Sequence, residues 1–226
     1  MEKINLLGTD EKLVRDVSVR KGSNKDKNKA IAKQFDFEYF DGTRDQGYGG
    51  YYYDGRWVAV ARKILERYEL PMNGNFLDVG CAKGFLLHDL KTIRPDLNVF
   101  GVDISSYAIQ NSLPTVRDSI SLANCMSLPF EDNFFDAVVC FNTIHNLDYD
   151  QCKEAIREFK RVAKNDKNIF IQVDAYTSED ELELFQEWVL TAKTYMRPDE
   201  WIQFFDLVDF DGDYFWTIIG FSGNTK

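Results

Sequence analysis

Two patterns of hydrophobic residues alternate along the chain. Short apolar runs such as residues 76–79 and 134–141 have the pattern of strands buried on both faces. Amphipathic stretches with helical spacing separate these runs, as at residues 57–68 and 150–163. Strands that alternate with helices predict an α/β fold with a doubly wound, mostly parallel sheet.

The pattern predicts five strand–helix units and one final strand. Strands are expected at residues 76–79, 98–102, 119–123, 134–141, 168–173 and 214–221, and helices at 57–68, 85–93, 106–112, 150–163 and 177–194. Such a chain leaves no room for a second catalytic domain. The functional site should therefore lie at the carboxyl ends of the strands of this one sheet.

The N-terminal part has a different composition. Residues 20–33 carry many lysines and few apolar side chains, which is typical of a solvated segment. Residues 35–55 are crowded with aromatic residues and glycines. We predict an N-terminal arm at 1–45, partly mobile, and a single domain at 46–226 in which residues 46–57 form a lid.

Charge and cysteine usage narrow the class of partner. The 226 residues include 27 Lys and Arg and 37 Asp and Glu, so the net charge is −10. An acidic chain disfavours nucleic acid as the main partner. An apolar run long enough for a membrane span and an apolar signal core are both missing, and four cysteines without a C-x-x-C pair favour reduced, cytoplasmic thiols. His, Asp and Glu residues have no convincing metal spacing, so no metal is expected.

Two loops of the pattern carry candidate chemistry. In FLDVGCAKGF, residues 76–85, Gly80 and Gly84 follow the first predicted strand and open the first helix, where backbone can approach a ligand closely. In GVDIS, residues 101–105, Asp103 ends the second strand, where a carboxylate can accept both hydroxyls of a ribose. The two loops together predict a nucleoside-containing ligand. The spacing differs from the G-x-G-x-x-G loop of dinucleotide-binding folds.

These motifs resemble those of the class I S-adenosylmethionine-dependent methyltransferases. FLDVGCAKGF is similar to the family's first motif and GVDIS to its second. Residues 123–136 look like its adenine-side loop, and AVVCFNTIHNL, residues 137–147, like its fourth strand and the loop that follows. The resemblance covers roughly residues 57–174. It implies a Rossmann-like sheet of seven strands with an antiparallel C-terminal strand, S-adenosylmethionine as cofactor, and methyl transfer as activity.

The resemblance also implies a set of cofactor-binding residues. Asp78, Gly80, Cys81 and Gly84 would line the methionine and ribose side, and Asp103 would bind the ribose hydroxyls. Ile104, Asn124 and Cys125 would lie at the adenine, and Asn142 near the methionine end. Ala82 replaces the family's middle glycine, and Asn124 stands where the family often has Asp; a plain turn residue is an equal interpretation of Asn124. Arg56 could pair with the carboxylate of the cofactor.

The acceptor side is less defined by sequence. His145 follows the fourth strand, where a histidine with an ordinary pKa could act as general base; a histidine that packs or hydrogen-bonds within its loop is the alternative. Candidates for the acceptor wall are Tyr48, Tyr51, Tyr52 and Trp188. Sequences with GYGGYYYDGRW before the first motif and TIHNL after the fourth strand look like bacterial methyltransferases of sugars or nucleotide-linked precursors of surface polysaccharides.

Three functions therefore stay open. The first is methyl transfer to a small molecule, with a sugar hydroxyl as the expected acceptor. The second is methylation of nitrogen or of a macromolecule, which would not need a catalytic base. The third is a cofactor-binding module without catalysis. An oxidoreductase that uses nicotinamide is a distant fourth, and the oligomeric state is not encoded in any feature of the sequence.

Overall fold

The computed structural model describes residues 1–22 and 24–220. Its strands are β1 Glu2–Lys3, β2 Lys12–Val14, β3 Asn75–Val79, β4 Asn98–Asp103, β5 Ile120–Leu122, β6 Ala137–Phe141, β7 Ile169–Ala175 and β8 Asp213–Gly220. Its α-helices are α1 Lys25–Ala32, α2 Phe37–Phe40, α3 Trp57–Arg67, α4 Phe85–Ile93, α5 Ser106–Gln110, α6 Tyr149–Val162, α7 Glu179–Trp188 and α8 Pro198–Leu207. Short 3-10 helices are η1 Val17–Arg20, η2 Arg117–Ser119, η3 Ile144–Asn146 and η4 Asp166–Asn168.

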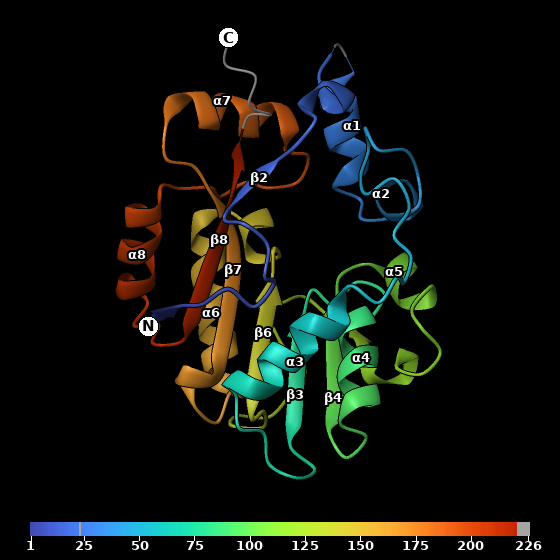
Figure 1. Ribbon diagram of the computed structural model, residues 1–226, viewed down its shortest axis with the longest axis vertical. Coiled ribbons are helices and arrows are strands. Elements are labelled where there is room, and N and C mark those ends of the chain that lie inside the picture. The colour runs from blue at the N-terminus through green and yellow to red at the C-terminus, as the bar shows by residue number, and fades with distance from the viewer. Residues whose placement is uncertain (23, 221–226) are drawn as a thin grey trace.

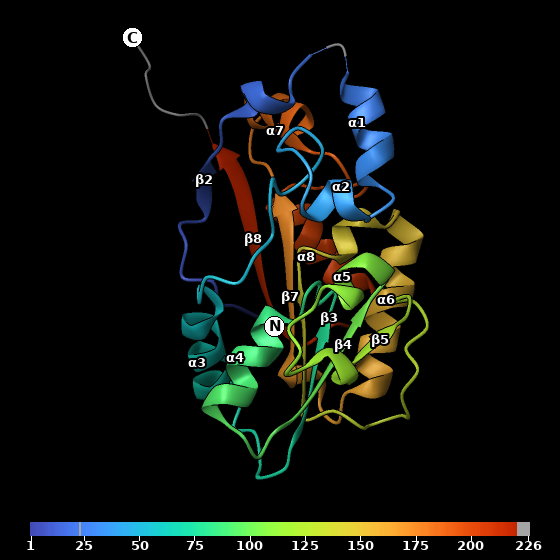
Figure 2. The ribbon, with the colours of Figure 1, turned by 90° about the vertical axis from the view of Figure 1, so that its right-hand side faces the viewer.

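The strands form one eight-stranded sheet between two layers of helices. Its order is β1-β8-β7-β6-β3-β4-β5, and β2 also pairs with β8. Helices α3 and α4 cover one face and α6 the other (Figures 1 and 2). Each face has its own apolar cluster: Ile64 and Leu87 represent the first, and Phe159 and Phe205 the second. The predicted Rossmann-like, mostly parallel sheet is confirmed.

The predicted antiparallel C-terminal strand is wrong. β8 runs parallel to β7, with Phe170 opposite Asp213 and Ala175 opposite Ile218. The cause is the connection between them: the predicted helix 177–194 is shorter than expected, and α8, which the sequence analysis missed, follows it. Two helices carry the chain back to the amino edge before β8 begins, so β8 must run in the direction of β7. Phe221, the predicted end of this strand, lies outside the described residues.

Two short strands of the N-terminal segment belong to the sheet. β1 and β2 pair in parallel with β8, and the end of α1 is buried at Ala32. Helices α1 and α2 lie above the carboxyl ends of the strands (Figure 1). This arrangement covers the edge at which the sequence analysis expects the functional site.

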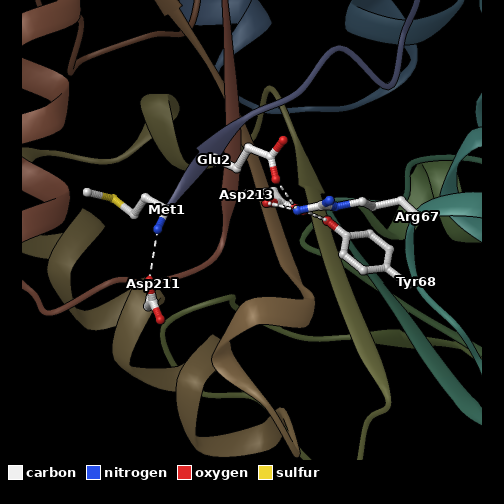
Figure 3. Close-up of polar contacts among 6 residues, drawn as sticks. All are labelled: Met1, Glu2, Arg67, Tyr68, Asp211 and Asp213. Atoms are coloured by element: carbon white, nitrogen blue, oxygen red, sulfur yellow. Dashed lines mark hydrogen bonds and ion pairs between the residues drawn. The ribbon is translucent and has the colours of Figure 1, made fainter.

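A polar cluster joins β1, α3 and β8 at the opposite edge (Figure 3). The guanidinium of Arg67 donates from Nε and Nη2 to the buried carboxylate of Asp213, at 2.8 and 2.9 Å, and from Nη2 to Glu2 at 2.7 Å. The hydroxyl of Tyr68 donates to Asp213 at 2.9 Å. Burial and the adjacent Asp213 raise the pKa of Tyr68 well above its usual value. Both oxygens of the buried carboxylate are thus hydrogen-bonded, and this offsets the free-energy cost of burying its charge.

Candidate functional site

A cavity of about 350 Å³ opens at the carboxyl ends of β3, β4 and β6, under α1 and α2. The sheet contributes the loops that follow these strands. The N-terminal segment from α1 to the start of α3, residues 25–56, lies over them and is called the cover below. Eight residues from the strand ends and the loops after them share this cavity: Gly80, Ala82, Asp103, Ile104, Asn124, Cys125, Asn142 and Thr143. The volume lies in the range of small-molecule sites.

The glycine loop is shaped by close backbone approach. Gly80 has φ +79°, and a Cβ atom there would lie 2.0 Å from Oγ1 of Thr143. Gly84 has φ +72°, and its Cβ would meet Val116 and Ile120 at 2.9 and 2.8 Å. Gly80 therefore lines the cavity, whereas Gly84 lets α4 begin against β5. Both positions require glycine for contact as well as for backbone conformation.

Asp103 is oriented by two backbone donors. The amide of Ala82 donates to its Oδ2 at 2.7 Å and the amide of Ser105 to its Oδ1 at 2.8 Å. Ala82 itself holds φ +49°, where the family usually has glycine. Each carboxylate oxygen keeps a free lone pair, so Asp103 can still accept hydroxyl groups that enter the cavity.

Asp78 places a second buried carboxyl near Asp103. It is buried at 5% exposure and does not itself line the cavity. Burial, and then the charge of Asp103, raise the pKa of Asp78 to about 8. Neither carboxylate forms an ion pair within the described part of the chain. The pair therefore favours a ligand that brings positive charge.

The predicted adenine-side residues meet at the cavity, together with Met126. Ile104 is 59% exposed there, an apolar side chain on which a flat ring can pack. Oδ1 of Asn124 accepts the amide of Met126 at 3.0 Å, a bond typical of a turn residue. Asn142 lines the cavity with φ +51°, and its amide donates to the carbonyl of Gln172 on β7.

Several predicted residues do not reach the cavity lining. The thiol of Cys81 is buried against Gly101, since a Cβ on that glycine would lie 2.6 Å from its Sγ. Arg56 pairs with Asp54 through an exposed ion pair of 2.6 Å. Tyr52 is 70% exposed. Arg56 therefore pairs with Asp54, whereas the sequence suggested the carboxylate of the cofactor as its partner.

The predicted aromatic wall is divided. Tyr48 lines the cavity. Tyr51 lies behind it, 4.6 Å from the ring of Tyr48 and stacked on Phe85 at 5.0 Å between ring centroids. Trp188 is at the end of α7, beneath the guanidinium of Arg20 at 3.9 Å. Of these three rings only Tyr48 can touch a ligand in the cavity.

His145 is buried in its loop and is not among the lining residues. Its Nδ1 accepts the amide of Asp174 at 3.2 Å, and its carbonyl accepts the amides of Lys193 and Thr194. Burial lowers the pKa of His145, although the nearby Asp174 acts in the opposite direction. A ring nitrogen that accepts an amide carries no proton, so the neutral ring holds its proton on Nε2. These contacts are those of the packing alternative.

Part of the cavity lining is not predicted from the sequence, because it comes from segments distant in the chain from the predicted motifs. The connection between α1 and α2 supplies Lys33 and Phe35, α2 supplies Tyr39 and Phe40, and the loop after α7 supplies Thr191 and Lys193. The lysine run at 20–33 gave no sign of this, because α1 is held by polar contacts such as the hydrogen bond from Asn28 to Asp45, and a polar segment has the composition of a solvated one.

A latch centred on Asp41 joins the cover to the glycine loop through three hydrogen bonds. Nζ of Lys83 donates to Oδ2 of Asp41 at 2.5 Å, and the hydroxyl of Tyr107 donates to the same oxygen at 2.6 Å. The amide of Tyr51 donates to Oδ1 of Asp41 at 3.0 Å. Burial acts to raise the pKa of Asp41, but the hydrogen bonds from Lys83 and Tyr107 outweigh it, and the pKa is lowered. The latch links the end of α2 to the glycine loop and to α5.

Comparison with known proteins agrees with this geometry. Residues 77–171 match the sequence profile of the methyltransferase domain family. Among curated relatives, the uncharacterized protein MJ0638 of Methanocaldococcus jannaschii is 28% identical over 67% of this chain and 64% of its own. A tRNA (carboxymethyluridine(34)-5-O)-methyltransferase of Arabidopsis thaliana is 30% identical over 65% of this chain and 34% of its own. The chain thus spans about a third to two thirds of the length of these relatives.

Solved structures share the fold at low identity. The YcgJ protein of Bacillus subtilis superposes with a TM-score of 0.55 at 19% identity, over 66% of each chain. The [4+2]-cyclase SpnF superposes with a TM-score of 0.54 at 19% identity, over 67% of this chain and 56% of the other. Residues 77–171 thus match the class of methyltransferase domains, and the two solved structures, at 19% identity, share the fold of this chain.

The residues at the cavity fit S-adenosylmethionine, the cofactor of this class. Asp103 presents carboxylate lone pairs suited to ribose hydroxyls, and Ile104, Cys125 and Met126 provide apolar surface for a purine. Two carboxyl groups that form no ion pair within residues 1–22 and 24–220 suit a ligand with cationic groups. In that described part, groups of three or more His, Cys, Asp or Glu placed to hold a metal ion do not occur. The described helices also include none long and apolar enough to cross a membrane.

Proposed function

We propose that this protein transfers a methyl group from S-adenosylmethionine to a small-molecule acceptor bound in the cavity. The observation that carries the proposal is that Asp103 and Asn142, at the ends of β4 and β6, line one cavity closed by Tyr48 from the cover. This cavity joins a surface for a nucleoside to a second surface built from the N-terminal segment and the loop after α7. Such a division suits two ligands held in contact.

The residues of the chain act by binding and orientation. S-adenosylmethionine, when bound, supplies a methyl group already activated on a sulfonium centre. Asp103 would accept the ribose hydroxyls while Ala82 and Ser105 hold its carboxylate in place. Asp78, once ionised, would stabilise positive charge beside it. Tyr48 and Phe40 would exclude water from the reacting centre.

The finer prediction of the sequence concerns the acceptor. It is a hydroxyl of a sugar or nucleotide-linked precursor of a bacterial surface polysaccharide, with His145 as general base. Support from the cavity is limited to its lining: Lys33, Lys193, Thr191 and Asn146 offer hydrogen-bond donors of the kind that recognise hydroxyl and phosphate oxygens. The polysaccharide role and the His145 base stay predictions.

A macromolecular acceptor is the alternative with an observation behind it. The Arabidopsis relative is named as a tRNA methyltransferase, and it matches over 65% of this chain. One solved neighbour, with a TM-score of 0.55, comes from a complex with the Trm112 methyltransferase activator of Haloferax volcanii. The net charge of −10 opposes RNA binding by this chain alone. A small acceptor is therefore the proposal that we favour.

The first experiment is calorimetric titration with S-adenosylmethionine, S-adenosylhomocysteine and NADH. Wild type should bind both sulfur nucleosides and not NADH, and Asp103→Ala should lose at least about tenfold in affinity for them. Asp118→Ala, an exposed carboxylate on η2, is the matched control and should bind as wild type. If neither sulfur nucleoside binds, the proposal fails.

Labelled methyl donor then separates the three functions. Incorporation into a nucleotide sugar supports the small-molecule acceptor, and incorporation into tRNA supports the alternative. Cofactor binding without transfer to any acceptor, including in the presence of an activator protein, would assign a binding module without catalysis.

A further inference from the structure

Three arginines surround one tryptophan at the junction of η1, α7 and the cover. The guanidinium carbons of Arg20, Arg44 and Arg15 lie 3.9, 5.1 and 5.8 Å from the ring centroid of Trp188. Figures 1 and 2 both show η1 beside α7 at this end of the molecule. Such a concentration of positive charge is unexpected in a chain with a net charge of −10.

The three guanidinium groups lack carboxylate partners within 4.0 Å in the described part of the chain. The neighbouring acids are engaged elsewhere. Glu187 pairs with Lys21 at 2.5 Å, and Oδ2 of Asp45 accepts the side-chain amide of Asn28 at 2.9 Å. Buried or half-buried arginines are usually paired with an anion.

The hydrogen bonds of the three arginines differ. Arg20 donates to the carbonyls of Arg44, Gly47 and Trp188, so it is the structural member of the cluster. Arg44 donates to the carbonyls of Gly47 and Tyr48 through Nη1 alone. Arg15 is exposed and donates to none of the described residues. Donors of Arg15 and Arg44 are therefore available for a ligand.

Repulsion inside the cluster favours an anion. Burial, and then the charge of Arg44, lower the pKa of Arg20 to about 10. Lys25 is close by, and burial, followed by the charges of Lys29 and Arg20, lowers its pKa to about 8. A bound anion would relieve this repulsion, and arginine forks match phosphate oxygens in geometry.

The cluster adjoins the cavity. Arg44 donates to the carbonyl of Tyr48, whose side chain lines the cavity, and Trp188 precedes the lining residue Thr191 by three residues. We propose that Arg15, Arg20 and Arg44 around Trp188 form a binding site for the phosphate groups of a small molecule. The site stands independently of the proposed methyl transfer, whereas its use by the methyl acceptor rests on that function.

The test is calorimetric titration with inorganic pyrophosphate and with uridine diphosphate. The variants are Arg15→Gln and Arg44→Gln. Arg62→Gln is the control, because Arg62 is exposed on α3 and distant in the chain from the cluster. Wild type should bind at least one probe, more weakly at high salt, and each of the first two variants should lose about tenfold in affinity. Arg62→Gln should bind as wild type.

The two probes separate two sources of the phosphate. Equal affinity for both assigns a site for phosphate alone, and tighter binding of uridine diphosphate assigns a nucleotide-bearing ligand. Arg15→Gln separates loss of binding from loss of folding. Arg15 forms no hydrogen bond with the described residues, so its replacement should leave the thermal unfolding midpoint unchanged. The proposal is overturned if neither probe binds to wild type, or if Arg15→Gln and Arg44→Gln bind as tightly as Arg62→Gln. Titration with S-adenosylmethionine is separate, so failure of methyl transfer would not be mistaken for failure of this site.

Discussion

Gly80 and Thr143 touch so closely that a single added methyl group would overlap both side-chain branches of the threonine. A Cβ on Gly80 would lie 2.0 Å from Oγ1 and 2.7 Å from Cγ2 of Thr143. The loop after β3 is thus locked to the loop after β6, and both loops line the cavity. The two halves of the site are coupled through this contact.

Replacement of Gly80 by alanine should therefore cost more than its backbone conformation alone. Gly55 has nearly the same φ, +78° against +79°, and open space around its Cβ, so Gly55→Ala is the matched control. Gly55→Ala should lose about 1–2 kcal/mol of unfolding free energy. Gly80→Ala should lose clearly more and should also bind S-adenosylmethionine more weakly; urea unfolding and titration measure both. Equal losses for the two variants would contradict the contact argument.

The sequence predicted the strand-end part of the site because that part is local. The order of strand, glycine loop and helix fixes where Gly80, Asp103 and Asn142 lie, since the carboxyl ends of parallel strands meet at one edge. Gly80 and Asp103 are predicted from their positions at the end of an apolar run, and Asn142 is implied by the family resemblance. The structure brings all three to one cavity.

The rest of the site depends on contacts between distant segments. Lys33 and Tyr39 reach the cavity because α1 and α2 fold over the sheet, and Asp41 reaches Lys83 across 42 positions of sequence. A single sequence contains no period that reports such contacts. The predicted direction of β8 was wrong for a related reason. The sequence pattern does not separate α8 from the connection between β7 and β8, and a shorter connection is typical of an antiparallel neighbour.

Asp78 should make the stability of the protein depend on pH. Its pKa is about 8 in the folded state, against about 4 for an unfolded aspartate. Between these values folding takes up a proton, so the unfolding free energy should fall as pH rises, by at most about 1.4 kcal/mol per pH unit, and level off above pH 8. Urea unfolding from pH 5 to 9 measures the slope.

Asp78→Asn is the control for this dependence. The amide does not titrate, so the variant should lose the slope that belongs to Asp78 while it keeps the slope of the other groups. Positive charge near Asp78 favours its ionised form, so S-adenosylmethionine should bind more tightly to wild type as pH rises from 6 to 8. Parallel slopes for wild type and Asp78→Asn would show that the carboxyl is ionised in the folded protein at neutral pH.

The latch at Asp41 should control access to the cavity. Asp41→Ala removes the acceptor of Lys83, Tyr107 and the amide of Tyr51 at once, and leaves the ammonium of Lys83 nearly buried without a partner. We expect faster proteolysis within residues 33–56 and about tenfold weaker binding of S-adenosylmethionine. Asp54→Ala is a control, because Asp54 forms an exposed ion pair in the same segment. The same protease sensitivity in both variants would mean that the latch does not hold the cover.

His145 offers the sharpest separation of a structural from a catalytic role. Its Nδ1 accepts the amide of Asp174, and the Oδ1 of an asparagine can occupy nearly the same position. His145→Asn should therefore keep that hydrogen bond, whereas His145→Leu should leave the amide without an acceptor and lose about 1–3 kcal/mol of unfolding free energy. If the packing role holds, His145→Asn retains turnover, and the pH profile of kcat stays as in wild type. If His145→Asn folds, binds S-adenosylmethionine as wild type and loses turnover by about a hundredfold or more, the general-base role predicted from the sequence is correct instead.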